Sequence, residues 1–296
     1  MKNKLESLIF NTVYKLLEIN TISIPSNLKE LLKKKMIEEK EKGSQLAYEQ
    51  ITLILKNLEF GEKNKLPICQ DTGMINIIFK FSPKFRFPNN FKDIINESIK
   101  FATEKIPLRP NTIDPIDEKI SNTNTGINTP PIYYEFSNEI EYLEIIVINK
   151  GGGAENMSKL LLLSPSTDIT EIKRNILNLV KEASGKPCPP IILGIGLGGD
   201  ATYCMYLAKK ALIRPLYSRN PRKEIRNLED ELLTEINELG VGVMGFGGLT
   251  TCLDVRIEWA LRHPASYPVG IIFQCYSHRI SKAIIDSKLN IKIIHD

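Results

Sequence analysis

Apolar residues recur at intervals of three and four positions over much of the chain, which is the spacing of amphipathic helices. Near the N-terminus this pattern is continuous enough to predict a helical layer. A glycine run before Ala154 predicts one further helix, over residues 154–163. The other predicted helices cover residues 5–20, 26–42, 46–58, 91–105, 169–183, 201–212 and 222–239.

Short runs rich in β-branched residues alternate with these helices and predict strands. They cover residues 74–79, 132–136, 143–148, 191–199, 241–244, 252–259 and 269–275. Because no internal repeat or linker divides the pattern, the sequence predicts a single mixed α/β domain over residues 1–296. In this fold class, the helical N-terminal layer is followed by mixed β-sheets flanked by helices.

Composition and charge narrow the function classes. The formal net charge of +4 over 296 residues suits a small anionic substrate and gives no argument for nucleic acid. No apolar run is long enough to cross a membrane. Five cysteines without regular spacing do not form a secreted disulfide framework. We therefore expect a reduced, cytoplasmic protein.

The segment Gly194–Gly199 fits G-x-G-x-x-G between a predicted strand and a predicted helix, which is the context of a dinucleotide-binding turn. A nucleotide-binding oxidoreductase is therefore one alternative function. The acidic residue expected about twenty positions later is missing, because residues 216–221 are basic and turn-like. The sequence favours close backbone packing, or a loop lining a cluster, as the role of these glycines.

The cysteines form no C-x-x-C pair, which excludes a zinc ribbon or a thioredoxin-like motif. Cys69, Cys188 and Cys275 lie in loop-like contexts, whereas Cys204 lies in a predicted helix and Cys252 at a predicted strand start. Three separated loop thiolates suggest an iron–sulfur cluster assembled by the fold. The alternative is a non-catalytic partner subunit whose cysteines are merely buried.

A further motif carries polar chemistry. The loop Pro67–Gly73 places a thiol, an amide and a carboxylate at Cys69, Gln70 and Asp71. A soft metal ligand beside a possible proton carrier and an amide is what a metal-assisted reaction needs. The alternative is a buried structural thiol beside a turn aspartate.

Four strings follow one another along nearly the whole chain: Cys69-Gln-Asp-Thr-Gly73, Lys150-Gly-Gly-Gly-Ala-Glu-Asn156, Cys188-Pro-Pro190 and Cys275-x-x-His278-Arg279. Together and in this order, they resemble the iron–sulfur-dependent class I fumarases. More narrowly, the chain resembles their α subunit, or the N-terminal domain of single-chain members, and the tartrate dehydratase α subunit shares the same frame.

The resemblance implies reversible hydration of fumarate to L-malate with a [4Fe-4S] cluster. It also assigns roles to individual residues. Cys69, Cys188 and Cys275 match the cluster ligands, Gln70 and Asp71 the active-site amide and carboxylate, Arg109 a substrate-carboxylate arginine, Gly152 a backbone contact to substrate, and His263 a histidine that works with the aspartate in proton transfer.

The same resemblance implies a partner. Fused family members continue into a C-terminal domain that supplies further basic residues and a catalytic threonine, whereas this chain ends at Asp296. We therefore expect a separate β subunit that completes the active site for a small dicarboxylate in a heteromer. The segment Gly153–Ser158 is closer to the fumarase version of its motif, which favours fumarate over the alternative substrate, tartrate.

Overall fold

The computed structural model describes residues 2–295, with side chains from residue 4 onward. By internal packing these residues divide into two compact units. Unit 1 comprises the chain up to Ser26, Asn57–Gly151 and the chain from Arg279 on, and unit 2 comprises Asn27–Lys56 and Gly152–His278. Both units combine helices with a sheet, so the predicted mixed α/β class is confirmed. The single domain stays a prediction.

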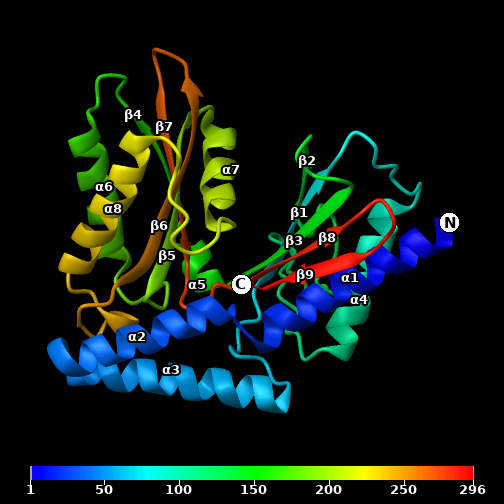
Figure 1. Ribbon diagram of the computed structural model, residues 1–296, viewed down its shortest axis with the longest axis horizontal. Coiled ribbons are helices and arrows are strands. Elements are labelled where there is room, and N and C mark those ends of the chain that lie inside the picture. Colours follow the sequence, from blue (N-terminus) through cyan, green and yellow to red (C-terminus); the bar gives the residue numbers. More distant parts are fainter. Residues whose placement is uncertain (1, 296) are drawn as a thin grey trace. The chain divides into compact units, whose positions relative to one another are not determined.

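Unit 1 is built on a five-stranded sheet in the order β2-β1-β3-β8-β9. Strand β1 is parallel to β2, and the other neighbours are antiparallel. Helices α1 and α4 pack against each other beside this sheet (Figure 1). The strands are β1 (Met74–Phe81), β2 (Ile132–Phe136), β3 (Leu143–Lys150), β8 (Ile280–Ile285) and β9 (Ile291–Ile294), and the helices are α1 (Lys2–Ile22) and α4 (Phe91–Lys105).

The register of this sheet brings three chain segments to the same end of its strands, which is called here the edge of unit 1. Met74, the first residue of β1, pairs with Lys150, the last residue of β3. Ile280, the first residue of β8, pairs with Ile148 of β3. The loop before β1, Gly151 after β3 and Arg279 before β8 therefore meet at the same edge, although they are far apart in sequence.

Unit 2 is built on a four-stranded sheet in the order β4-β7-β5-β6. Helix α7 covers one face, and the core beneath α6 and α8 fills the other (Figure 1). The strands are β4 (Lys159–Leu163), β5 (Ile191–Gly199), β6 (Cys252–Arg262) and β7 (Tyr267–Gln274). The helices are α5 (Gly152–Glu155), α6 (Ile169–Ala183), α7 (Ala201–Leu212) and α8 (Lys223–Glu238). Helix α2 (Ser26–Lys42) begins at the unit boundary, and α3 (Gln45–Asn64) crosses it.

The glycines of the G-x-G-x-x-G segment allow α7 to approach β5 closely. A Cβ at Gly194 would lie 2.2 Å from the carbonyl oxygen of Ala208, and one at Gly196 would lie 2.0 Å from that of Cys204. Both distances are far below van der Waals contact, so only glycine fits. The N-terminus of α7 is capped by Asp200, whose Oδ1 accepts a 2.7 Å hydrogen bond from the Tyr203 amide. This geometry supports close packing and gives the nucleotide-binding alternative no support.

Three expectations differ from the structure. Residues 154–163 do not form one helix, because α5 ends at Glu155 and the leucine-rich end becomes β4, which pairs with β7. Residues 241–244 form no strand, because a 3₁₀ turn follows Gly242, whose φ is 68°. No element was predicted for β8 and β9. Within residues 2–295, no helix has the length and apolarity needed to cross a membrane.

Candidate functional site

The loop that carries the predicted thiol, amide and carboxylate lies at the assembled edge of unit 1. It contains no helix or strand and runs directly into β1 at Met74. Cys69 and Asp71 are half-buried, and Gln70 is exposed. A polar loop that ends on a buried strand holds its side chains at a fixed place relative to the sheet, as binding and catalytic loops commonly do.

The Asp71 carboxylate is oriented by its neighbours. Its Oδ1 accepts a hydrogen bond from the Gly73 amide at 2.9 Å and one from the Asn111 side chain at 3.2 Å. The Asp71 carbonyl oxygen accepts a 2.7 Å hydrogen bond from Nη1 of Arg279. Asp71 is therefore held at both its side chain and its backbone, while remaining half-buried.

Arg109 is tied to the same loop through its backbone. Its amide donates to Oγ1 of Thr72 at 3.0 Å, and its side chain is exposed. Thr72 is the residue next to Asp71, so the structure brings the backbone of Arg109, whose side chain is exposed, to the edge of unit 1 that holds the Asp71 carboxylate. An arginine fork can bind a carboxylate group, and an aspartate can carry a proton.

Cys188 and Cys275 lie together at one end of the two central strands of the unit 2 sheet, which is called here the Cys188–Cys275 edge. Cys188 precedes β5 and Cys275 follows β7, and these strands are antiparallel neighbours. The amide of Tyr276 donates to the carbonyl oxygen of Cys188 at 3.3 Å, which joins the two loops. Cys188 is exposed and has a φ of 55°. A left-handed conformation is uncommon for a residue other than glycine and is concentrated at functional sites.

The donor chemistry at this edge fits an iron–sulfur cluster. Cys188 is exposed, Cys275 and the unit 1 residue Cys69 are half-buried, and none of the three forms a disulfide. Thiolates are the ligands that hold such clusters. Within neither unit do the described residues gather three His, Cys, Asp or Glu side chains around one point.

The remaining cysteines are part of the core. Cys204 is fully buried, and its thiol donates to the carbonyl oxygen of Gly196 at 3.1 Å. Burial raises the pKa of Cys204 to about 11 and also raises the pKa of Cys252. Since the thiolate is the ligand and nucleophile, neither residue is suited to bind metal. Both residues are therefore assigned to the core.

Thiol labelling in the absence of metal should separate the two groups. At pH 8 a thiol whose pKa lies near 11 is almost entirely protonated, so Cys204 and Cys252 should react slowly. We expect fast reaction at Cys69, Cys188 and Cys275 in the native chain, and at all five cysteines after denaturation. Mass spectrometry of the labelled peptides identifies the sites. Equal rates at all five cysteines in the native chain would contradict this assignment.

Two other predicted site residues of unit 2 are His263 and Gly152. His263 lies away from the Cys188–Cys275 edge, and Gly152 lies at the start of a very short helix. His263 lies in the turn between β6 and β7, at the opposite end of β7 from Cys275. Eight strand residues separate these ends, which corresponds to roughly 25 Å. Gly152 is exposed and begins α5, a helix of only four residues. The proton-transfer role of His263 stays a prediction that its place in unit 2 does not support.

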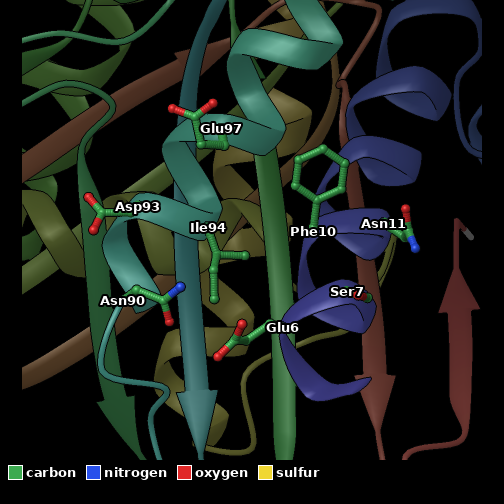
Figure 2. Close-up of a pocket in the computed structure, with 8 residues that line it drawn as sticks. All are labelled: Glu6, Ser7, Phe10, Asn11, Asn90, Asp93, Ile94 and Glu97. Carbon is green, nitrogen blue, oxygen red and sulfur yellow. The ribbon is translucent and has the colours of Figure 1, made fainter. Parts of the chain in front are cut away.

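A surface hollow in unit 1 lies away from these residues. It has a volume of about 340 Å³ and is formed by α1, α4 and the residue before α4. Figure 2 shows its polar side chains around Phe10 and Ile94. Phe10 and Asn20, whose side chain binds β3 near the Asp71 edge, are about 15 Å apart along α1 at 1.5 Å per residue. None of the predicted site residues lines this hollow, whose residues are Glu6, Ser7, Phe10, Asn11, Asn90, Asp93, Ile94 and Glu97.

Sequence reasoning missed three neighbours of Asp71: Asn111, Gly151 and Arg279. Asn111 follows Arg109 in the same Pro-Leu-Arg-Pro-Asn string, Gly151 begins the glycine run, and Arg279 ends the last string of the resemblance. Each string therefore drew attention to a segment, but not to the residue in it that lies beside Asp71.

Comparison with known proteins identifies the family. The family model of fumarate hydratase (fumerase) matches residues 10–284. A protein of Methanocaldococcus jannaschii, provisionally named L(+)-tartrate dehydratase subunit alpha, is 42% identical over 95% of this chain and 99% of its own length. The Escherichia coli K12 L(+)-tartrate dehydratase subunit alpha is 30% identical over 75% of this chain and 74% of its own. A provisional class I fumarate hydratase of Geobacillus stearothermophilus is 31% identical over 92% of this chain, which spans 54% of that protein. The chain belongs to the fumarate hydratase (fumerase) family.

Proposed function

We propose that the chain is the α subunit of a hydro-lyase that hydrates fumarate reversibly to L-malate. The observation that carries the proposal is the edge of unit 1, where Asp71 is held by two hydrogen bonds to Oδ1 and Arg109 is attached to the adjacent Thr72. A carboxylate that can move a proton and a guanidinium that can hold a substrate carboxylate are the groups that this reaction needs. Membership in the fumarate hydratase family supports the reaction class.

In the proposed site, Cys69, Cys188 and Cys275 hold a [4Fe-4S] cluster. With three protein ligands, such a cluster supplies a Lewis acid for a substrate oxygen when it is bound. The common edge of Cys188 and Cys275 supports this assignment, as does the fact that none of the three cysteines forms a disulfide. In this proposal, the chain's own residues bind the substrate and move the proton.

The remaining residues take roles in substrate binding. Arg109 holds one carboxylate group of the dicarboxylate, and the exposed amide of Gln70 donates a hydrogen bond to the substrate. The backbone of Gly152 provides a further contact. Asp71 takes a proton from the carbon next to a carboxylate in the dehydration direction and returns one in the hydration direction. His263 is retained as its predicted partner in proton transfer.

A β subunit completes the site in this proposal. Relatives named as alpha subunits support a partner chain. A dicarboxylate carries two negative groups, and Arg109 is the only exposed arginine beside Asp71 that we assign to the substrate. Further basic groups from the β subunit would hold the second carboxylate. We place the assembled enzyme in the cytoplasm, in keeping with its free thiols.

A second candidate function is dehydration of L(+)-tartrate. It is favoured by the relative that matches 95% of this chain, because that relative is named for tartrate. Tartrate differs from malate by one additional hydroxyl group, and a site built to hydrogen-bond a hydroxyl discriminates strongly against a substrate that lacks it. The two substrates are therefore separable by rate.

The test uses the α and β chains produced together without oxygen and supplied with iron and sulfide. Malate, fumarate and L(+)-tartrate are compared by their kcat/KM values. We expect the largest value with the malate–fumarate pair. A larger value with tartrate would assign the second function, and no activity on any of the three, in protein with a full iron content, would refute the hydro-lyase proposal.

A further inference from the structure

Asn111 contacts the Asp71 loop at three points. Its Nδ2 lies 3.2 Å from Oδ1 of Asp71, 3.3 Å from Oγ1 of Thr72 and 3.3 Å from the carbonyl oxygen of Gly73. An amide nitrogen carries two hydrogens, so it can serve two of these acceptors at once. The backbone of Asn111 is also held, because its backbone N–H donates to Oδ1 of Asn124 at 2.8 Å. Asn111 is therefore a fixed donor for the carboxylate and its loop.

Both hydrogen bonds described above for the Asp71 carboxylate end on Oδ1, from Gly73 and Asn111. Oδ2 lies on the side of Gly151. A Cβ at Gly151 would be 3.2 Å from Oδ2 of Asp71 and 3.4 Å from Nη2 of Arg279. Any side chain at position 151 would therefore crowd both the carboxylate and the guanidinium, and glycine lets the backbone after β3 pass close to the two groups.

Arg279 lies beneath this loop as a buried cation. Only 1% of its surface is exposed, and Nη1 donates to the Asp71 carbonyl oxygen at 2.7 Å. Among the described residues, no hydrogen-bond partner reaches its buried Nε. Its backbone is fixed by the sheet, because its carbonyl oxygen accepts a 3.0 Å hydrogen bond from the Asn149 amide. Burying a guanidinium is costly unless it is well paired, so this arginine needs a reason beyond packing.

We propose that Asn111 and Arg279 are positioning residues for Asp71. Asn111 holds Oδ1 and Arg279 holds the Asp71 backbone, so that the carboxylate keeps a fixed position beside Gly151. The positioning itself is a property of the α chain alone, and only its consequence for the reaction rests on the proposed function.

The positioning is tested first by hydrogen exchange in the isolated α chain. Asn111→Leu keeps the approximate size of the side chain and removes its donor, and Arg279→Met does the same for the guanidinium. We expect exchange in a peptide covering residues 69–76 to become about tenfold faster or more in each variant, as the loss of a hydrogen bond to a charged group predicts. The Gly73 amide, which donates to Asp71, should change most.

Two further variants keep this test specific. Asn64→Leu is the matched control, because its Nδ2 also donates to a backbone carbonyl, that of Phe60, but on the exposed surface of α3. It should leave exchange over residues 69–76 unchanged. Arg279→Lys retains a donor for the Asp71 carbonyl oxygen and should restore much of the protection lost in Arg279→Met. Unchanged exchange in both Asn111→Leu and Arg279→Met, or equal acceleration in Asn64→Leu, would overturn the proposal.

The kinetic arm uses the assembled, iron-loaded enzyme. Misplacing a reacting group by about 1 Å can cost about a hundredfold in rate, so we expect Asn111→Leu to lower kcat by about tenfold to a hundredfold with little change in KM or iron content. A wild-type kcat retained in Asn111→Leu would refute the role of this positioning in the reaction. A wild-type enzyme without activity would refute the proposed function, whereas the exchange result would still decide the positioning.

Discussion

Cys188→Ser should remove most of the iron bound by the reconstituted chain and abolish hydro-lyase activity with the β subunit. Serine has nearly the shape of cysteine, but its hydroxyl does not supply the soft thiolate that holds iron–sulfur clusters. The exposed position of Cys188 next to the Cys275 loop makes this thiolate one of two donors at that edge. Iron and sulfide analysis with visible absorption measures the loss, against about four irons per wild-type chain.

Cys204→Ser is the matched control for this experiment. Its side chain is fully buried and donates to the Gly196 carbonyl oxygen, which a serine hydroxyl can also reach. We expect this variant to retain iron and activity close to the wild-type values. Cys188→Ser protein that is folded and keeps its full iron content would contradict the cluster assignment and leave the cysteines as structural residues.

Several elements could be predicted closely because their signals are local. The helices over residues 91–105 and 169–183 have the predicted bounds in the structure. In α6, the periodic apolar positions Ile172, Ile176 and Val180 are buried, and Asp168 caps the first turn. The loop character of residues 67–73 follows in the same way from its flanking proline and glycine.

The strand β4 could not be predicted from local pattern. Its leucine run follows a glycine-rich segment and was expected to continue a helix. In the structure Leu161 pairs with Val269, more than a hundred residues later, so the pairing with β7 decides its conformation. Strand propensity depends on such tertiary context more than helix propensity does.

The environment of Asp71 was beyond sequence reasoning for the same reason. Asn111 is 40 residues from Asp71, and Arg279 is 208 residues away. Their meeting depends on the register of β1, β3 and β8, which no local signal specifies. The three strings that contain Asp71, Asn111 and Arg279 were recognised separately, and only the sheet shows that they form one edge.

Asp71→Asn should lower kcat by about a hundredfold to ten-thousandfold, the contribution typical of a positioned general acid or base. The amide oxygen can still accept from the Gly73 amide, as Oδ1 does at 2.9 Å, so the loop should keep its shape. Cys69 is unchanged, so iron content should stay near the wild-type value. A loss confined to kcat with KM nearly constant would indicate a group that acts in the transition state and not in substrate binding.

Asp93→Asn provides the comparison for Asp71→Asn. Asp93 is an exposed carboxylate in the first turn of α4, beside the hollow of Figure 2, and it belongs to the same unit. The same loss of one negative charge there should leave kcat and KM unchanged, which separates a local role of Asp71 from a general effect of charge. If Asp71→Asn kept more than about a tenth of the wild-type kcat, a loss far smaller than general acid–base catalysis predicts, another group would have to carry the proton, and the edge of unit 1 would act only in substrate binding.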